Sequence, residues 1–297
     1  MKILSFGEIL FDLIEGKPYL GGAPLNFAAH AAQCGAETYI FSAVGQDELG
    51  TQALEKIEAL GVQTTLVQID HDHPTGTVEV TLQDGQPDYT ILQEVAYDYI
   101  QPPENPEDVW AVTYDVLYFG TLAQRCPSSR ETLHHLVQQQ PFKHVFYDVN
   151  LRKDSYTEEI IRESLPLCTL LKLNEEEVTV LSTLLYGLEM EPEAFAQKIT
   201  EQYQTQVVLI TAGALGCYLY EQGQFTFSPA DPVTAVDAIG AGDAFSAAFV
   251  FHYLNGEPAT SAAALANKLG GYVASRRGPI PTYSEEIKRE LGIMNPS

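Results

Sequence analysis

Basic residues are scarce in this chain of 297 residues, where 16 lysines and arginines stand against 40 aspartates and glutamates and the net charge is −24. Nucleic-acid binding depends on clustered lysine and arginine side chains, so we expect neither DNA nor RNA as a partner. An acidic protein can still bind ATP if its site supplies local hydrogen-bond donors and a cation. We interpret the surplus of acids as a solvated surface.

Cysteines are also few, and the four present (Cys34, Cys126, Cys168 and Cys217) form no C-x-x-C pair. This spacing favours reduced, mostly buried thiols in a cytosolic protein over a disulfide framework. An uncharged apolar run of about 18 residues is missing as well, which predicts that no segment spans a membrane. We therefore expect a cytoplasmic protein.

Three common site motifs are absent. The chain has no G-x-x-x-x-G-K-[ST] segment, no G-x-G-x-x-G after its first apolar stretch, and no H-E-x-x-H. Their absence argues against a P-loop kinase, an ordinary dinucleotide-binding domain and a zinc site of that type.

The chain does show a regular alternation of strand and helix patterns. "ETYIFSAVG" (37–45) is typical of a strand, and the next segment is an amphipathic helix closed by Gly61. Such alternation predicts an α/β fold, a doubly wound and mostly parallel sheet flanked by helices. We expect a single domain over residues 1–297.

Between about residues 62 and 100 the pattern changes to alternating polar and apolar residues around Asp84-Gly85, which is typical of a hairpin. We expect a small β-sheet subdomain there, inserted from about 12–20 and 63–100. An insert of this kind can close over a site as a lid.

The segment "DAIGAGDAF" precedes an apolar helix near the C-terminal end. Backbone N–H groups of Gly240, Ala241 and Gly242 could point at one anion, helped by the helix dipole. Asp243 would repel that anion, so we assign it a separate role as general base toward a hydroxyl. From this segment alone, an ordinary acid at a helix N-terminus is an equally good interpretation.

A second glycine segment, "GGAPLNFA", also precedes a predicted helix. Gly21 and Gly22 permit close approach of the backbone to a ligand, and Asn26 offers a donor and an acceptor to a polyol. Asp12 could accept two hydroxyl hydrogen bonds. Taken alone, Asn26 could equally be a cap and Asp12 a loop acid.

Two further segments end predicted strands. In "LKLNEEE" Asn174 and Glu177 share a helix face and could hold a Mg²⁺-bound water network, although an acid-rich first helical turn explains them as well. In "TAGALG" Thr211, Gly213 and Gly216 suit packing of a nucleotide against backbone, with a plain β-turn as the alternative.

Together and in this order, these segments resemble the ribokinase family of sugar kinases, also called PfkB-type. "GGAPLNFAAHAAQCG" is similar to the N-terminal signature of the family, and "DAIGAGDAF" to its C-terminal one, with Ala238 where a threonine is usual. The resemblance spans essentially the whole chain. It implies a ribokinase-like fold with a β-sheet lid, and transfer of the γ-phosphoryl group of ATP to a sugar or nucleoside hydroxyl.

The resemblance also implies roles for individual residues. Asp243 would be the catalytic base, and the N–H groups of Gly240, Ala241 and Gly242 the anion hole. Facing the sugar would be Asp12, Gly21, Gly22, Asn26 and Asp243, with Arg152 over the substrate or phosphates unless it forms a surface ion pair. Near the nucleotide would lie Asn174, Thr211, Gly213, Gly216, Gly242 and Asn267.

Metal ions are implied as well. Asn174 and Glu177 would lie near Mg²⁺ through water. A monovalent cation, K⁺ in this family, would sit beside the anion hole at Asp237, Ile239, Val273, Arg276, Gly278 and Thr282.

"GEILFDLI", "DVNLR" and "SRRGPIPTY" are most similar to fructokinase-type members. We therefore expect an ATP-dependent kinase that converts fructose to fructose 6-phosphate. Ribose, 2-keto-3-deoxygluconate or a nucleoside is the alternative acceptor, and a non-catalytic sugar-binding relative is a hypothesis of another class. Sugar and ATP are the expected partners, with a homodimer formed through the lid.

Replacing the presumed base tests this assignment. The Asp243→Asn variant should lose about 10²-fold or more in kcat while substrate binding is largely kept, because the amide cannot accept the hydroxyl proton. Steady-state kinetics measure both quantities. Turnover close to that of the unaltered enzyme would remove Asp243 from the role of base.

Overall fold

The computed structural model describes residues 1–14, 16–83, 86–103, 112–153 and 155–293. The turn expected at Asp84-Gly85 lies outside these ranges. Among the helices so described, none combines the length and apolarity that a membrane crossing requires.

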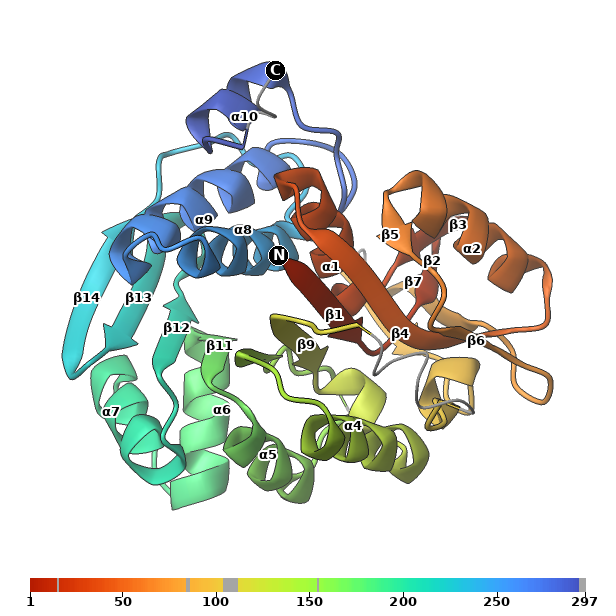
Figure 1. Ribbon diagram of the computed structural model, residues 1–297, viewed down its shortest axis with the longest axis horizontal. Helices are drawn as coiled ribbons and strands as arrows, with labels where there is room; N and C mark the ends of the chain where they lie inside the picture. Colours follow the sequence, from red (N-terminus) through yellow and green to blue (C-terminus); the bar gives the residue numbers. More distant parts are fainter. Residues whose placement is uncertain (15, 84–85, 104–111, 154, 294–297) are drawn as a thin grey trace.

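A large sheet runs through the middle of the molecule (Figure 1). In the described residues its strand order is β14-β13-β12-β11-β10-β9-β1-β4-β5, with β6 also paired to β4. All pairs are parallel except β12–β13 and β13–β14. The strands are β1 (Lys2–Phe6), β4 (Glu37–Gly45), β5 (Val62–Gln63), β6 (Val67–Asp70), β9 (Val116–Gly120), β10 (His144–Asp148), β11 (Leu170–Asn174), β12 (Val207–Thr211), β13 (Gly216–Glu221) and β14 (Gln224–Pro229).

Helices cover both faces of this sheet. Figure 1 shows α1, α8 and α9 on one side and α4 to α7 on the other, as the predicted doubly wound α/β arrangement requires. The helices are α1 (Ala23–Cys34), α2 (Glu48–Ala59), α4 (Pro127–Gln139), α5 (Glu158–Ser164), α6 (Glu175–Tyr186), α7 (Pro192–Tyr203), α8 (Ala241–Leu254), α9 (Ala259–Ala274) and α10 (Glu285–Glu290). The short 3₁₀ helices are η1 (Ala96–Tyr99), η2 (Leu122–Gln124), η3 (Leu165–Leu167) and η4 (Gly213–Leu215).

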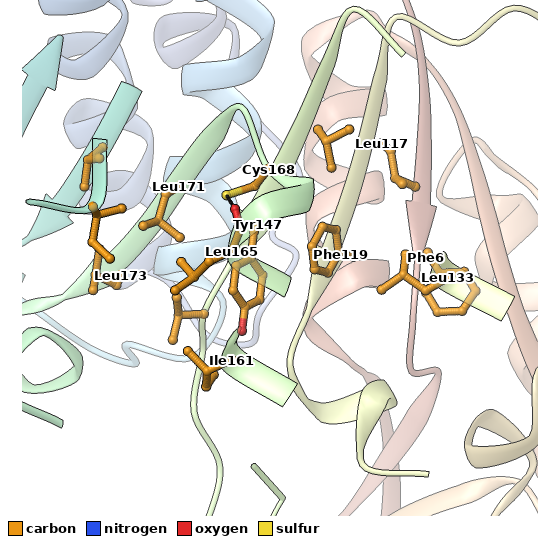
Figure 2. Close-up of a cluster of buried hydrophobic side chains, with 14 of the residues drawn as sticks. Phe6, Leu117, Phe119, Leu133, Tyr147, Ile161, Leu165, Cys168, Leu171 and Leu173 are labelled. Carbon is orange, nitrogen blue, oxygen red and sulfur yellow. Dashed lines mark hydrogen bonds between the residues drawn. The ribbon is translucent and has the colours of Figure 1, made fainter. Parts of the chain in front are cut away.

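Alternate residues of the central strands pack on opposite faces of the sheet. Phe119 and Tyr147 stack with ring centroids 4.7 Å apart on the side of α4 to α7, in the cluster that Figure 2 shows. Their strand neighbours Tyr118 and Phe146 pack with Phe27 of α1 on the other side. Because both faces are buried, the strands are apolar almost throughout, so a charged side chain within them needs a partner.

A second, four-stranded sheet lies beyond β4, next to α2 (Figure 1). It joins two antiparallel pairs through a parallel β2–β7 pair, in the order β3-β2-β7-β8. Residues 62–70, which the sequence pattern assigns to the inserted subdomain, contribute β5 and β6 to the large sheet instead. The strands of the second sheet are β2 (Leu10–Ile14), β3 (Lys17–Gly21), β7 (Gly76–Gln83) and β8 (Gln86–Ile91).

A buried ion pair fastens the chain where it returns from the second sheet. The Arg125 guanidinium, beyond η2, donates to both carboxylate oxygens of Asp98 at 2.7 and 2.8 Å, and to the carbonyl oxygen of Leu92 at 2.6 Å. The two side chains are only 10% and 4% exposed. Leu92 directly follows β8, so this pair ties the end of the second sheet to the main domain.

Removing one member of this pair should cost stability. Because Arg125→Met leaves the carboxylate of Asp98 buried without its partner, we expect the free energy of unfolding to fall by roughly 3–5 kcal/mol in urea titrations. The surface pair of Lys288 and Glu285 provides a control, since Lys288→Met should change stability little. Equal effects of the two substitutions would contradict a structural role for the buried pair.

Candidate active site

The candidate site lies where the carboxyl ends of the parallel strands meet the start of α8. Asp148 ends β10, Asn174 ends β11 and Thr211 ends β12, so the sheet itself gathers them at one edge. Open α/β sheets bind their ligands at this edge.

Asp243 and Asn26, from the two glycine segments, meet directly at this site. The side-chain amide of Asn26, in α1, donates to Asp243 Oδ2 at 2.8 Å. Asp243 is the third residue of α8 and is half-buried. The structure thus brings together two residues that stand 217 positions apart.

The environment of Asp243 makes it a better base than an exposed aspartate. Burial raises its pKa to about 6, and repulsion by Asp148 adds to this. The hydrogen bond from Asn26 and the charges of Lys172 and Arg152 oppose the shift. At neutral pH the carboxylate is mostly ionised and yet holds a proton more readily than its ordinary pKa of 3.8 implies.

The turn before α8 depends on glycine. Gly240 caps the helix with φ of 79°, and a Cβ there would lie 2.4 Å from the carbonyl oxygen of Pro279. The N–H of Ala241 donates to the carbonyl oxygen of Ala238 at 3.2 Å. Of the three N–H groups expected to face one anion, this one is therefore engaged within the turn, whereas the N–H of Gly242 belongs to the first helical turn and has no intrahelical acceptor.

The residues expected to face the sugar lie at the junction with the second sheet. Asp12 is in β2, and its Oδ2 lies 3.3 Å from the position that a Cβ on Gly21 would take. Gly22 also makes a close approach, but to the protein itself, since its Cβ would lie 2.4 Å from the carbonyl oxygen of Glu8. Asn26 Oδ1 is buried and has no hydrogen-bond partner among the described residues, so it is available to a ligand hydroxyl.

Glu8 is a buried acid that the sequence interpretation overlooked. Its Oε1 accepts the N–H of Ala23 at 3.3 Å, while Oε2 has no partner in the described part of the chain. Burial raises its pKa to about 7; Arg152 opposes this shift and Asp243 adds to it. An acid inside the apolar stretch "SFGEILF" was the available signal.

Arg152 lies in the turn after β10, where its exposed side chain acts on three acids. Its charge opposes the raised pKa of Glu8, Asp12 and Asp243, and burial is the main cause of the shift in each. Arg152 therefore faces the same space as the candidate base and the sugar-facing acid. Among the described residues Arg152 makes no ion pair at salt-bridge distance with Glu8, Asp12 or Asp243.

A second overlooked group is the ion pair of Lys172 and Asp148. The two residues are register partners in the parallel pair β10–β11, and Lys172 Nζ lies 3.0 Å from each carboxylate oxygen. A lysine in "LLKLN" and an aspartate in "FYDVN", both inside apolar strands, could have revealed the pair.

The N-x-x-E element is a capping box. Asn174 Oδ1 accepts the N–H of Glu177, and Glu177 Oε2 accepts the N–H of Asn174, both at 2.8 Å. Glu177 Oε1 also accepts the N–H of Leu151 at 2.7 Å, which holds the turn after β10. No cluster of three or more metal-ligating side chains occurs in the described residues. Because backbone N–H groups already occupy the side-chain oxygens of Asn174 and Glu177, these residues could contact a Mg²⁺ through its water ligands.

The residues expected near the nucleotide line the end of the sheet beside α9. Thr211 ends β12 and Gly213 begins η4, but Gly216 and Asn267 already have partners within the protein. The amide of Asn267 donates to the carbonyl oxygen of Ser228 at 2.9 Å, and Gly216 packs against the same oxygen. A surface pocket of about 200 Å³ is lined there by Asp231, Val233, Asn267, Lys268, Gly271, Tyr272, Ser275, Ile287 and Glu290.

The residues expected to hold a monovalent cation lie around one loop. Asp237 accepts the N–H of Ile239 at 3.0 Å and that of Gly278 at 3.2 Å. The carbonyl oxygen of Val273 accepts the N–H of Arg276 at 2.9 Å.

Thr282, the last residue of that expected cation set, also has a partner. Its carbonyl oxygen accepts the hydroxyl of Tyr272 at 3.0 Å. Oxygen atoms of Asp237, Val273 and Thr282 are thus engaged with protein donors.

The fold is a ribokinase-like α/β fold, and the protein is a phosphotransferase acting on alcohol groups. Its candidate site places the carboxylate of Asp243 in the first turn of α8. Residues 4–286 match the model of the pfkB family carbohydrate kinases, and the chain belongs to that family.

Individual relatives agree with this assignment. A fructokinase of Salmonella typhimurium is 28% identical over 314 residues, covering 98% of this chain and 99% of the relative. An aminoimidazole riboside kinase of Salmonella typhimurium strain LT2 is 28% identical over 265 residues, covering 84% and 80%. The structure of an uncharacterized sugar kinase, PH1459 from Pyrococcus horikoshii, in complex with ATP superposes with a TM-score of 0.78 and 26% identity, covering 94% of each chain.

The buried acid Glu8 should make stability depend on pH. Its pKa is about 7 when folded and near the ordinary 4.5 when unfolded, so the folded state binds more protons between these values and loses stability as pH rises through them. Glu8→Gln removes this dependence. The difference in free energy of unfolding, variant minus unaltered protein, should therefore be about 2–3 kcal/mol larger at pH 8.5 than at pH 5.

Urea titrations at the two pH values measure the difference. Glu131→Gln, on an exposed position of α4, controls for the substitution itself. A gain that is the same at both pH values would show that Glu8 does not titrate in this range.

Proposed function

We propose that this carbohydrate kinase transfers the γ-phosphoryl group of ATP to a hydroxyl of fructose and forms fructose 6-phosphate. The observation that carries the proposal is the 2.8 Å hydrogen bond between Asn26 and Asp243, which joins the sugar-facing segment to the base. The fructokinase relative, alignable over nearly the whole of both chains, supports fructose as the acceptor. The ATP complex of the structural relative supports ATP as the donor.

In the proposed reaction Asp243 accepts the proton of the sugar hydroxyl as its oxygen attacks the γ-phosphorus. The new O–P bond forms while the bond between the γ-phosphorus and the bridging oxygen breaks, and ADP leaves with that oxygen. The carboxylate, with its pKa near 6, can release the proton to water after each turnover. Asn26 keeps Asp243 oriented through its amide, and its free Oδ1 can accept a second sugar hydroxyl.

The start of α8 would stabilise the transferring phosphoryl group. The N–H of Gly242 and the helix dipole favour negative charge at this end of the helix. Mg²⁺, when bound with ATP, would neutralise phosphate charge, and Asn174 and Glu177 would contact its water ligands. We place K⁺ beside the loop of Asp237.

The nucleotide would lie over the end of β12 and the start of β13. Thr211 and Gly213 border this region, and exposed apolar side chains there offer a surface to a purine. These are Leu215 (68% exposed), Val233 (47%) and Val236 (58%).

The second sheet would act as the lid. Asp12 stands in this sheet and would contact the sugar directly, so closure would bring it toward Asp243 and exclude water. Exposed apolar side chains of the sheet and its end, Ile14 (38%), Tyr19 (50%) and Leu92 (45%), would form the surface for a homodimer.

A different acceptor is the second candidate, because the aminoimidazole riboside kinase is as similar in identity as the fructokinase. Its name points to a riboside, and the Asn26–Asp243 arrangement would serve any primary hydroxyl. Ribose and 2-keto-3-deoxygluconate belong in the same comparison.

A coupled assay of ADP release across a panel of sugars and nucleosides tests the choice. We expect the highest kcat/KM with fructose, because a fructokinase aligns with 98% of this chain. A higher value with a riboside would replace fructose as the acceptor. Sugar binding without ADP release, with Mg²⁺ and K⁺ present, would indicate a non-catalytic relative.

A further inference from the structure

A buried ammonium group lies directly under the first turn of α8. The side chain of Lys172 is only 10% exposed, and its Nζ bonds both oxygens of Asp148 at 3.0 Å. A Cβ on Gly242 would lie 3.2 Å from Nζ. A positive charge thus lies next to the first turn of α8. That turn carries the free N–H of Gly242 and the proposed base Asp243.

The surrounding hydrogen bonds hold this charge in place. Besides Lys172, the carboxylate of Asp148 accepts the hydroxyl of Ser246 at 3.1 Å and that of Tyr118 at 3.3 Å. The four residues come from β9, β10, β11 and α8, and Asp148 is completely buried. A charge fixed in this way needs no rearrangement when negative charge develops nearby.

Lys172 also matters in the local balance of charge. Burial opposes its charged form, but Asp148, Glu177 and Asp243 outweigh that effect and raise its pKa, so it stays an ammonium. Lys172 and Arg152 are the cations of the described residues that hold down the pKa of Asp243. Arg152 is exposed, so its charge is screened by solvent, whereas that of Lys172 is not.

We propose that Lys172 is a positioning residue for phosphoryl transfer: fixed by Asp148 beneath Gly242, its charge offsets the negative charge that accumulates at the start of α8 during transfer. This proposal rests on the proposed function, because it requires that phosphoryl transfer takes place at the start of α8. Lys172 acts through Gly242 and Asp243 and not by contact with the sugar. A purely structural ion pair, needed only for folding, is the competing explanation.

The Lys172→Met/Asp148→Asn double variant separates the two explanations. It removes both charges with little change in volume, so no unpaired charge stays buried and the midpoint of thermal unfolding should change by a few degrees at most. We expect kcat to fall on the order of 10- to 100-fold, with KM for ATP and for the sugar within about threefold of the unaltered values.

A second readout follows the charge at the phosphoryl position directly. ADP with aluminium fluoride imitates the transferring phosphoryl group, so the unaltered enzyme should bind this pair more tightly than ADP alone. In the double variant the affinity for ADP should persist while the gain from aluminium fluoride falls about as much as kcat. A structural ion pair would leave that gain unchanged.

The Lys2→Met/Glu37→Gln variant is the matched control, because it removes an ion pair between register partners of β1 and β4 at the amino-terminal edge of the same sheet, away from the site. It should keep kcat within about threefold. The proposal is overturned if the folded Lys172→Met/Asp148→Asn variant also keeps kcat within about threefold, or if the Lys2→Met/Glu37→Gln variant loses as much. If circular dichroism shows the double variant unfolded, Lys172→Gln, whose amide can still donate to Asp148, takes its place with the same criteria.

The sugar used is whichever one the unaltered enzyme phosphorylates fastest in the panel. A different preferred sugar therefore changes the proposed function and leaves this test intact. If the unaltered enzyme is active but the Lys172→Met/Asp148→Asn variant keeps its kcat, the role of Lys172 is contradicted and the proposed function is not.

Discussion

The carboxylate of Asp243 has to stay ionised at a half-buried helix end, next to the carboxylate of Asp148 and within electrostatic reach of Glu8. Each carboxylate disfavours the charge on the next, and burial weakens the screening that water would provide. Lys172, which is buried, and Arg152, which is exposed, relieve this repulsion. The positions of these two cations therefore matter for the site, because each lies within electrostatic reach of Asp243 and favours its ionised form.

The parallel sheet makes such compensation possible. Its strands end at one edge, so Asp148 and Lys172 become register partners and α8 can be laid across them. The second sheet meets the same edge through Glu8 and Gly22, whose backbones touch. The two sheets thus share one junction, and the residues of the second sheet that we propose to face the sugar need no long loops to reach Asp243.

Much of this could be predicted from the sequence, because strand and helix patterns and glycine turns act locally. The alternation of elements, the strand over 37–45 and the helix that ends just before Gly61 are observed as expected. Pairing between distant strands is not local, which is why residues 62–70 were assigned to the insert although they join the large sheet. The surroundings of Glu8 and Lys172 depend on burial by distant segments. The sequence shows each only as a charged residue within an apolar run, and it does not show which group lies beside it.

The close contacts of the glycines have a consequence for how variation in this family should be interpreted. At Gly22 and Gly240 a side chain would collide with a carbonyl oxygen 2.4 Å away, whatever ligand the site binds. Relatives with different substrates, and even relatives that have lost catalysis, should therefore keep these two glycines. Conservation of these two glycines alone would therefore report the fold. Under the proposed function, the side chains of Asn26, Asp243 and Lys172 would distinguish an active kinase from an inactive descendant.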